Sequence, residues 1–187
     1  MSRLPTLGVP SSGSARRILV SDACVLINFL KLGRLDLLTA IGGFRLTTTR
    51  LVHDEITDSV QRQALDHAIS VGGIEVVDPE STEVREAYIE LREAGLGKGE
   101  ASCLAFCGDT EGILLACDER AGCFHRAVSK LHLEGRIVTT RDLINLAAHE
   151  GRLSLDQANG LLADLRTRFR FSSPDLCSDE PLPPAFR

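Results

Sequence analysis

Short apolar runs alternate with longer amphipathic segments along most of this chain. The runs at residues 18–21, 44–48, 74–77, 113–117 and 136–140 have the length and composition of buried β-strands. Between them, apolar residues recur at helical spacing. Because strands and helices alternate, the sequence predicts an α/β fold with three layers, α/β/α, around a mostly parallel central sheet.

Local signals predict where several helices begin and end. Gly33 follows the first helical pattern as a C-cap. Asp78 and Pro79 predict an N-cap and first helical position for a helix that reaches Ala94. A further helix is expected to start at Glu119, directly after a strand, and residues 154–157 form a capping box for the last helix. Residues 16–172 are therefore expected to form one domain, between a disordered leader at 1–15 and a flexible tail at 173–187.

Composition narrows the function classes. The 187-residue chain has a net charge of −5, which argues against a free-standing nucleic-acid binder but not against an enzyme that acts on nucleic acid through metal. No signal-peptide pattern or apolar run of about 20 residues occurs, so we expect a cytoplasmic protein with no membrane contact. The six cysteines fit reduced core positions, and Cys103 and Cys107 lack the partner spacing of a structural zinc site.

Four carboxylates stand beside apolar elements. Asp22 and Asp118 each close a predicted strand, Glu100 lies in the first turn of a helix, and Glu55 lies beside a helical apolar stripe. Ligands bind at the carboxyl ends of parallel strands, and Mg²⁺ and Mn²⁺ prefer oxygen ligands. The acids therefore indicate a divalent-metal site. The alternative is structural, with the aspartates as helix caps and the glutamates as solvated helix residues.

The segments around these acids resemble a known family. DACVLIN at Asp22, RLVHDEI at Glu55, GKGEASCLA at Glu100 and LLACDERAG at Asp118 are similar in order and spacing to the acidic blocks of PIN-domain ribonucleases, nearest the VapC-type toxins of VapBC toxin–antitoxin systems. The resemblance implies that all four acids are catalytic and that Asp22, Glu100 and Asp118 are the central ligands of Mg²⁺ or Mn²⁺. Glu55 is the least secure member.

The resemblance also implies roles around the acids. Glu119 matches a second acid beside the last block, and Thr139 and Thr140 match a small hydroxyl position after the last core strand. These threonines are candidate substrate-binding residues, with an N-cap as the alternative role. Arg120 is a third candidate, because it lies close to Asp118 and could hold a phosphate.

Departures from the family pattern concern polar contacts. The common Asp-Thr-Asn opening is Asp22-Ala23-Cys24 here, and Ala116 stands where Ser or Thr often precedes the last acid. We therefore expect the polar contacts of those side chains to be missing. His53, two residues before Glu55, is either a substrate contact or an ordinary half-buried histidine.

The expected function is a metal-dependent endoribonuclease in which a metal-activated water hydrolyses an RNA phosphodiester bond. The resemblance implies an RNA substrate, a homodimer and a small antitoxin protein as partner. One alternative is a catalytically weak PIN-like module that binds nucleic acid or protein. Another is an aspartate-dependent phosphatase with Asp22 as nucleophile, although Cys24 stands where such enzymes carry a second aspartate.

Overall fold

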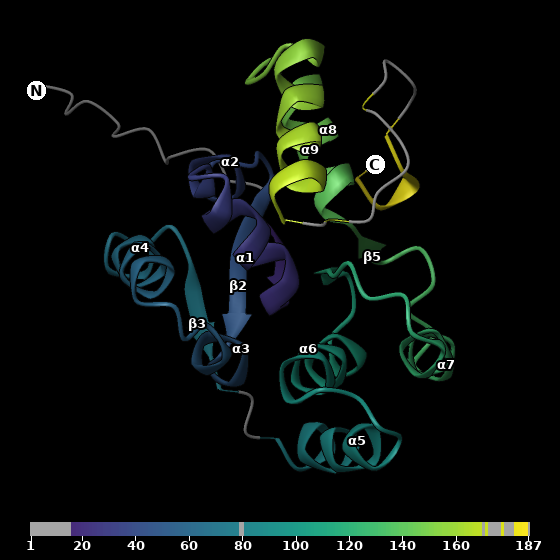
Figure 1. The fold of residues 1–187 in the computed structure, drawn as a ribbon. Helices are drawn as coiled ribbons and strands as arrows, with labels where there is room; N and C mark the ends of the chain where they lie inside the picture. Colours follow the sequence, from purple (N-terminus) through teal and green to yellow (C-terminus); the bar gives the residue numbers. More distant parts are fainter. Residues whose placement is uncertain (1–15, 79–80, 170, 172–176, 178–181, 187) are drawn as a thin grey trace, which may run out of the picture.

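The computed structural model describes residues 16–78, 81–169, 171, 177 and 182–186. Figure 1 shows helices packed around a central sheet. The strands are β1 (Arg17–Ser21), β2 (Phe44–Thr49), β3 (Glu75–Val77), β4 (Leu114–Ala116) and β5 (Ile137–Val138). The helices are α1 (Ala23–Lys31), α2 (Leu35–Thr39), α3 (Arg50–Glu55), α4 (Ser59–Ser70), α5 (Thr82–Glu93), α6 (Lys98–Asp109), α7 (Gly122–Lys130), α8 (Thr140–His149), α9 (Leu155–Phe169) and the 3₁₀ turn η1 (Pro184–Phe186).

The five strands pair in parallel in the order β3-β2-β1-β4-β5. The predicted three-layer α/β/α architecture is confirmed, and the sheet is parallel throughout. Strands β1, β2 and β3 follow one another toward one edge of the sheet, and β4 and β5 follow one another toward the other edge. The strand order therefore reverses between β1 and β4, and ligands of open parallel sheets bind in the crevice at such a point.

Strand β4 and the last three residues of β1 are buried, as expected for a sheet covered on both faces. Leu19, Val20, Leu114 and Leu115 are at most 1% exposed. On one side α1 packs against α8, which packs against α9, and on the other α6 packs against β1, β2 and β4 (Figure 1). The residues after β1 and β4 are thus fixed by the most buried part of the molecule.

Helix α1 ends as its sequence predicts. Gly33 follows the C-cap residue Leu32 with φ of +63°, and the N–H groups of Gly33 and Arg34 donate to carbonyls in the last turn. Glycine adopts this left-handed conformation at no steric cost. The predicted capping box at the last helix is also confirmed, since Ser154 and Gln157 exchange backbone-to-side-chain hydrogen bonds at the start of α9.

Two predicted helix starts are wrong. Helix α5 begins at Thr82, because the Ser81 hydroxyl accepts the N–H of Val84, so Asp78 is not its N-cap. Pro79 lies outside the described residues. Helix α7 begins at Gly122 rather than at Glu119. The Glu119 carboxylate accepts the backbone N–H groups of the next two residues, which shapes residues 118–121 into a loop.

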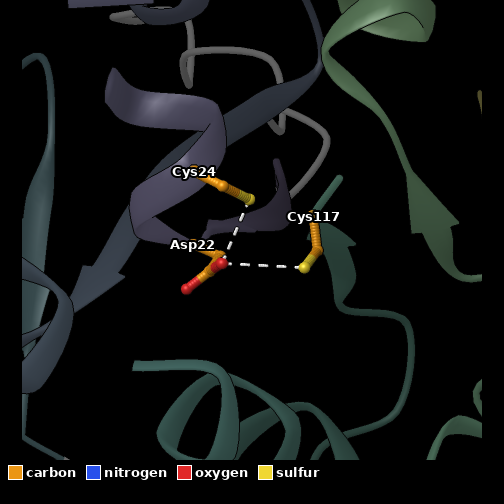
Figure 2. Close-up of side chains that lie close together, drawn as sticks. All are labelled: Asp22, Cys24 and Cys117. Atoms are coloured by element: carbon orange, nitrogen blue, oxygen red, sulfur yellow. Dashed lines mark hydrogen bonds between the residues drawn. The ribbon is translucent and has the colours of Figure 1, made fainter. Parts of the chain in front are cut away.

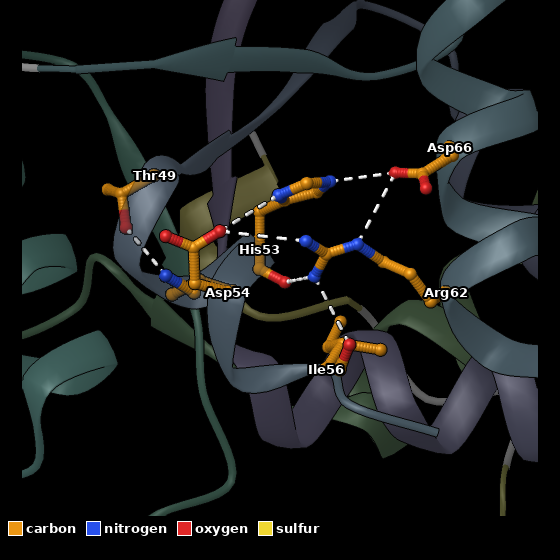
Figure 3. Close-up of polar contacts among 7 residues, drawn as sticks. Thr49, His53, Asp54, Ile56, Arg62 and Asp66 are labelled. Carbon is orange, nitrogen blue, oxygen red and sulfur yellow. Dashed lines mark hydrogen bonds and ion pairs between the residues drawn. The ribbon is translucent and has the colours of Figure 1, made fainter. Parts of the chain in front are cut away.

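A polar network joins α3 to α4 (Figure 3). The His53 ring lies 2.8 Å from Asp66 and 3.4 Å from Asp54, and is almost fully buried. Arg62 donates to the backbone carbonyls of His53 and Ile56 and lies 3.6 Å from both aspartates. His53 thus has a structural part in holding the two helices together.

The predicted leader, residues 1–15, lies outside the described residues, as does most of the predicted tail. Of that tail, Cys177 and Ala185 are buried, and the Cys177 N–H donates to Asn159 at 2.8 Å. Arg17 at the start of β1 donates to the Ala185 carbonyl at 2.9 Å. Across the described part of the chain, no helix combines the length and apolar character needed to cross a membrane.

Candidate active site

Asp22 lies at the carboxyl end of β1 and is 4% exposed. Its Oδ2 accepts the thiol of Cys24 at 3.1 Å and that of Cys117 at 3.6 Å, as Figure 2 shows. Its Oδ1 has no hydrogen-bond partner. Although Asp22 precedes α1, its side chain makes no capping hydrogen bond. The geometry therefore does not support the alternative that this acid is a helix cap.

Asp118 follows β4, on the other side of the strand-order reversal. Thr140 donates its backbone N–H to Oδ1 at 2.8 Å and its hydroxyl to Oδ2, and Asn28 donates to Oδ2 at 3.0 Å. Burial raises the pKa of Asp118, while these hydrogen bonds and the charge of Arg120 oppose that rise. The carboxylate is thus fixed by residues from α1, β4 and α8. It also does not cap α7, which starts further along the chain.

Glu100 sits in the first turn of α6, where Oε2 accepts the Gly97 N–H at 3.0 Å. Burial raises the pKa of the Glu100 carboxyl, and the negative charges of Asp22 and Glu119 raise it further. The pKa of Glu119 is lowered, first by the hydrogen bond from the Ala121 N–H. The structure therefore brings the carboxylates of Asp22 and Glu119 within electrostatic range of Glu100.

Glu55 ends α3 and is exposed. Its Oε1 accepts the Gly99 N–H at 2.8 Å, and a Cβ at Gly99 would lie only 2.5 Å from its Oε2. Only glycine permits this approach. Glu55 therefore anchors the start of α6 beside Glu100, and its hydrogen bond goes to that backbone rather than to Asp22 or Asp118.

The thiol of Cys24 connects the two aspartates. It donates to Asp22, and its Sγ accepts the backbone N–H of Asp118 at 3.2 Å. The prediction that Cys24 removes polar contacts from the site is wrong, because sulfur is both a weak donor and a weak acceptor. Ala23 and Ala116 provide no polar side-chain contact, as predicted, and both are buried in the core.

The candidate substrate-binding residues divide between two roles. Thr139 caps α8, where its hydroxyl and the Asp142 carboxylate form a reciprocal capping box. Thr140 is fully buried against Asp118. Arg120 is exposed and lines a pocket of about 290 Å³ together with Asp118 and Thr139. Of the three, Arg120 is the one whose position leaves it accessible to a ligand.

Three residues with contacts at the site, Asn28, Cys24 and Cys117, were not anticipated from the sequence. Asn28 bonds both Asp118 and Thr140, and its signal was a lone amide within an apolar helical run. The thiols of Cys24 and Cys117 both contact Asp22. Cys117 lies 95 residues from Asp22 in the sequence, so no local sequence pattern indicates that contact. Cys103 and Cys107 are buried free thiols in α6.

The donor set fits a divalent cation. A buried carboxylate oxygen without a partner is costly, and a cation would satisfy Oδ1 of Asp22. Among the described residues, no basic side chain forms an ion pair with Asp22 or Glu100. Among the described residues, Asp22, Glu100 and Asp118 do not bring three carboxylate oxygens within 4.8 Å of one another, so these acids do not by themselves form a closed metal site.

The fold is therefore that of an α/β protein in which Asp22 and Asp118 follow the two strands, β1 and β4, between which the strand order reverses. A family model described as a PIN domain matches residues 18–179, and the chain belongs to the PIN-domain family. PIN domains have a nuclease-type fold and are generally nucleases, which supports a hydrolase activity that typically uses divalent metal. A comparison with curated proteins gives no match.

Proposed function

We propose that this protein is a Mg²⁺- or Mn²⁺-dependent endoribonuclease of the toxin type. The observation that carries the proposal is the buried, unpartnered oxygen of Asp22 beside Glu100, at the strand-order reversal of a PIN-domain sheet. Asp22, Glu100 and Asp118 would hold the metal. A divalent ion at this position supplies Lewis acidity at the phosphate and lowers the pKa of a water.

The protein's own side chains prepare the site for that chemistry. Asn28 and Thr140 orient the Asp118 carboxylate through three hydrogen bonds. Burial and the negative charges of Asp22 and Glu119 raise the pKa of the Glu100 carboxyl, and a bound cation would offset this repulsion. Glu55 acts on the site by fixing the start of α6.

Arg120 is the residue proposed to bind a substrate phosphate. It is exposed, lines the pocket beside Asp118, and forms no ion pair with an acidic side chain among the described residues. A guanidinium matches phosphate geometry through two parallel N–H groups. With a net charge of −5, RNA binding would depend on the metal and a few such cations.

The finer parts of the proposal rest on the resemblance of the four acidic blocks to VapC-type toxins. These are RNA as the substrate, a homodimer, a small antitoxin protein that covers the site, and a cytoplasmic location. The preference for RNA over DNA is tested by offering the same sequence in both forms, because only RNA carries the 2′-hydroxyl.

The test is cleavage of a single-stranded RNA by the parent and by Asp118→Asn, with Mn²⁺ or with a chelator. Asp109→Asn is the matched control, since Asp109 is exposed at the far end of α6. We expect cleavage by the parent and the control only with metal, and a loss of at least about 100-fold in Asp118→Asn, more than an outer-sphere partner contributes. Equal cleavage by Asp118→Asn and the parent would overturn the assignment.

A second function is favoured by one observation. Two thiols occupy Oδ2 of Asp22, where a nuclease centre would be expected to present a free carboxylate to hard cations. A PIN-like binding module with weak catalysis would explain this. Calorimetry with Mn²⁺ separates the two functions: no Mn²⁺ binding at millimolar concentration supports the module, and Mn²⁺ binding together with RNA cleavage supports the nuclease.

A further inference from the structure

Two thiols and one carboxylate meet at the end of β1. Cys24 comes from the first turn of α1 and Cys117 directly follows β4, and both point at Oδ2 of Asp22 (Figure 2). The sulfur–oxygen distances are 3.1 Å and 3.6 Å, and the three ligand atoms all lie within 4.8 Å of one another. Among the described residues, this is the group of acidic, Cys or His side chains that comes closest together in this way.

These distances suit a tetrahedral ion. With the usual zinc–sulfur and zinc–oxygen bond lengths and a tetrahedral angle, a sulfur and an oxygen ligand stand roughly 3.5 Å apart. The two observed separations lie on either side of that value. Three protein ligands and one open position form a common arrangement for zinc in proteins.

Two further features of these ligands support a cation at this position. Oδ1 of Asp22 is buried without any partner, on a side chain that is 4% exposed. The backbone N–H of Asp118 donates to Cys24 Sγ at 3.2 Å. Groups in this position behind a ligand orient it for the metal.

The chemistry of the ligands decides which ion is preferred. Sulfur ligands favour zinc over Mg²⁺ and Mn²⁺, and zinc also stands above Mn²⁺ in general affinity. On binding, the two S–H groups release their protons to solvent and the thiolates coordinate the ion. We propose that Asp22, Cys24 and Cys117 form a zinc-binding site.

A regulatory consequence rests on the proposed nuclease function. Asp22 would belong to both sites, so zinc held by the thiols would withdraw this carboxylate from Mg²⁺ or Mn²⁺. The zinc form would then be the inactive form of the enzyme. Zinc binding itself does not depend on the protein being a nuclease.

The binding test uses Co²⁺ as the probe, because thiolate ligation to Co²⁺ gives a charge-transfer band in the near ultraviolet. Metal-free parent, Cys24→Ser, Cys117→Ser and Cys123→Ser are titrated with Co²⁺ and then with Zn²⁺. Cys123 is the matched control for Cys24, since it is a half-buried free thiol in α7 outside the cluster. Circular dichroism and urea unfolding establish which variants are folded.

We expect the band in the parent and in Cys123→Ser, bleached by added Zn²⁺. In Cys24→Ser and Cys117→Ser the band should weaken or vanish, with zinc affinity at least about 100-fold lower. The absence of a band in the parent overturns the zinc site. So does a band of parental intensity in a folded Cys24→Ser variant, and this remains decisive if the more buried Cys117→Ser fails to fold.

A separate measurement addresses inhibition. Each variant's Mn²⁺-dependent RNA cleavage is compared with and without Zn²⁺, and zinc should inhibit the parent and Cys123→Ser but not Cys24→Ser. A cobalt band without any cleavage would keep the zinc site and reject the nuclease function. Cleavage without a cobalt band would reject the zinc site and keep the nuclease.

Discussion

Replacing Asp22 with Asn should make the metal-free protein more stable. Asp22 is 4% exposed, one of its oxygens has no partner, and the other receives only weak thiol donors. A buried polar group left unsatisfied costs about 1–3 kcal/mol, and more when it is charged. The negative charge gains about 0.3–1 kcal/mol from the N-terminus of α1. The burial cost is larger, so Asp22→Asn should gain about 1–2 kcal/mol, or about 2–8 °C in Tm.

Bound metal should reverse the order of stability of the parent and Asp22→Asn. A ligand present at about a hundred times its Kd stabilises the form that binds it by about 2.7 kcal/mol. The parent should therefore become the more stable protein at saturating Mn²⁺, because Asp22→Asn lacks the central carboxylate and gains little. A site that functions through a cation sacrifices stability in the metal-free protein in this way.

The assay is thermal unfolding in chelator and in Mn²⁺, followed by circular dichroism. Asp156→Asn makes the same chemical change at an exposed position in the first turn of α9. It should lose about 0.3–1 kcal/mol of dipole stabilisation in either condition. If Asp22→Asn unfolds below the parent in chelator, the carboxylate is structural and the argument for a cation at Oδ1 fails.

Three further outcomes follow from contacts described above. Thr140→Val removes a hydroxyl from Asp118 and should lower Mn²⁺ affinity by about 10–100-fold in calorimetry, and unchanged affinity would contradict its positioning role. Arg62→Ala removes the donor to the His53 carbonyl and should cost about 1–3 kcal/mol in urea unfolding, whereas a neutral effect would show that the α3–α4 network contributes nothing. Glu100 has a raised pKa in the folded protein, so the metal-free parent should lose stability as pH rises above the ordinary value of 4.5. Glu100→Gln should lose less between pH 4.5 and neutrality, and parallel stability profiles for the two proteins would contradict this.

The architecture could be predicted from the sequence because it depends on periodic burial. The strand at residues 18–21 and the strand at 113–117 carry continuous apolar runs, and in the structure they are the adjacent central strands. Helix starts were harder, because several polar side chains near an expected start can accept backbone N–H groups. Ser81 caps α5 three residues after the predicted Asp78, and Glu119 bonds its own loop instead of opening a helix.

The acidic residues of the candidate site could be named from the sequence, but the side chains that contact them could not. Asp22 and Asp118 follow strands and Glu100 opens a helix, and those positions can be found in a single sequence. The thiols around Asp22 could not be predicted, because Cys24 and Cys117 meet only after β1 pairs with β4. In the sequence, both read as small core hydrophobes. The assignment of Asp22, Glu55, Glu100 and Asp118 as catalytic remains a prediction for the experiments above.

The three hydrogen bonds that Asn28 and Thr140 donate to Asp118 have a consequence for how the protein folds during synthesis. Asn28 reaches it across 90 positions and Thr140 across 22, from opposite ends of the domain. During synthesis, the carboxylate emerges before the segment that orients it. A nascent chain therefore carries its acids without their final arrangement until α8 has left the ribosome and docked. If the proposed nuclease function holds, this order of synthesis would keep the enzyme inactive while it is still close to the RNA that encodes it.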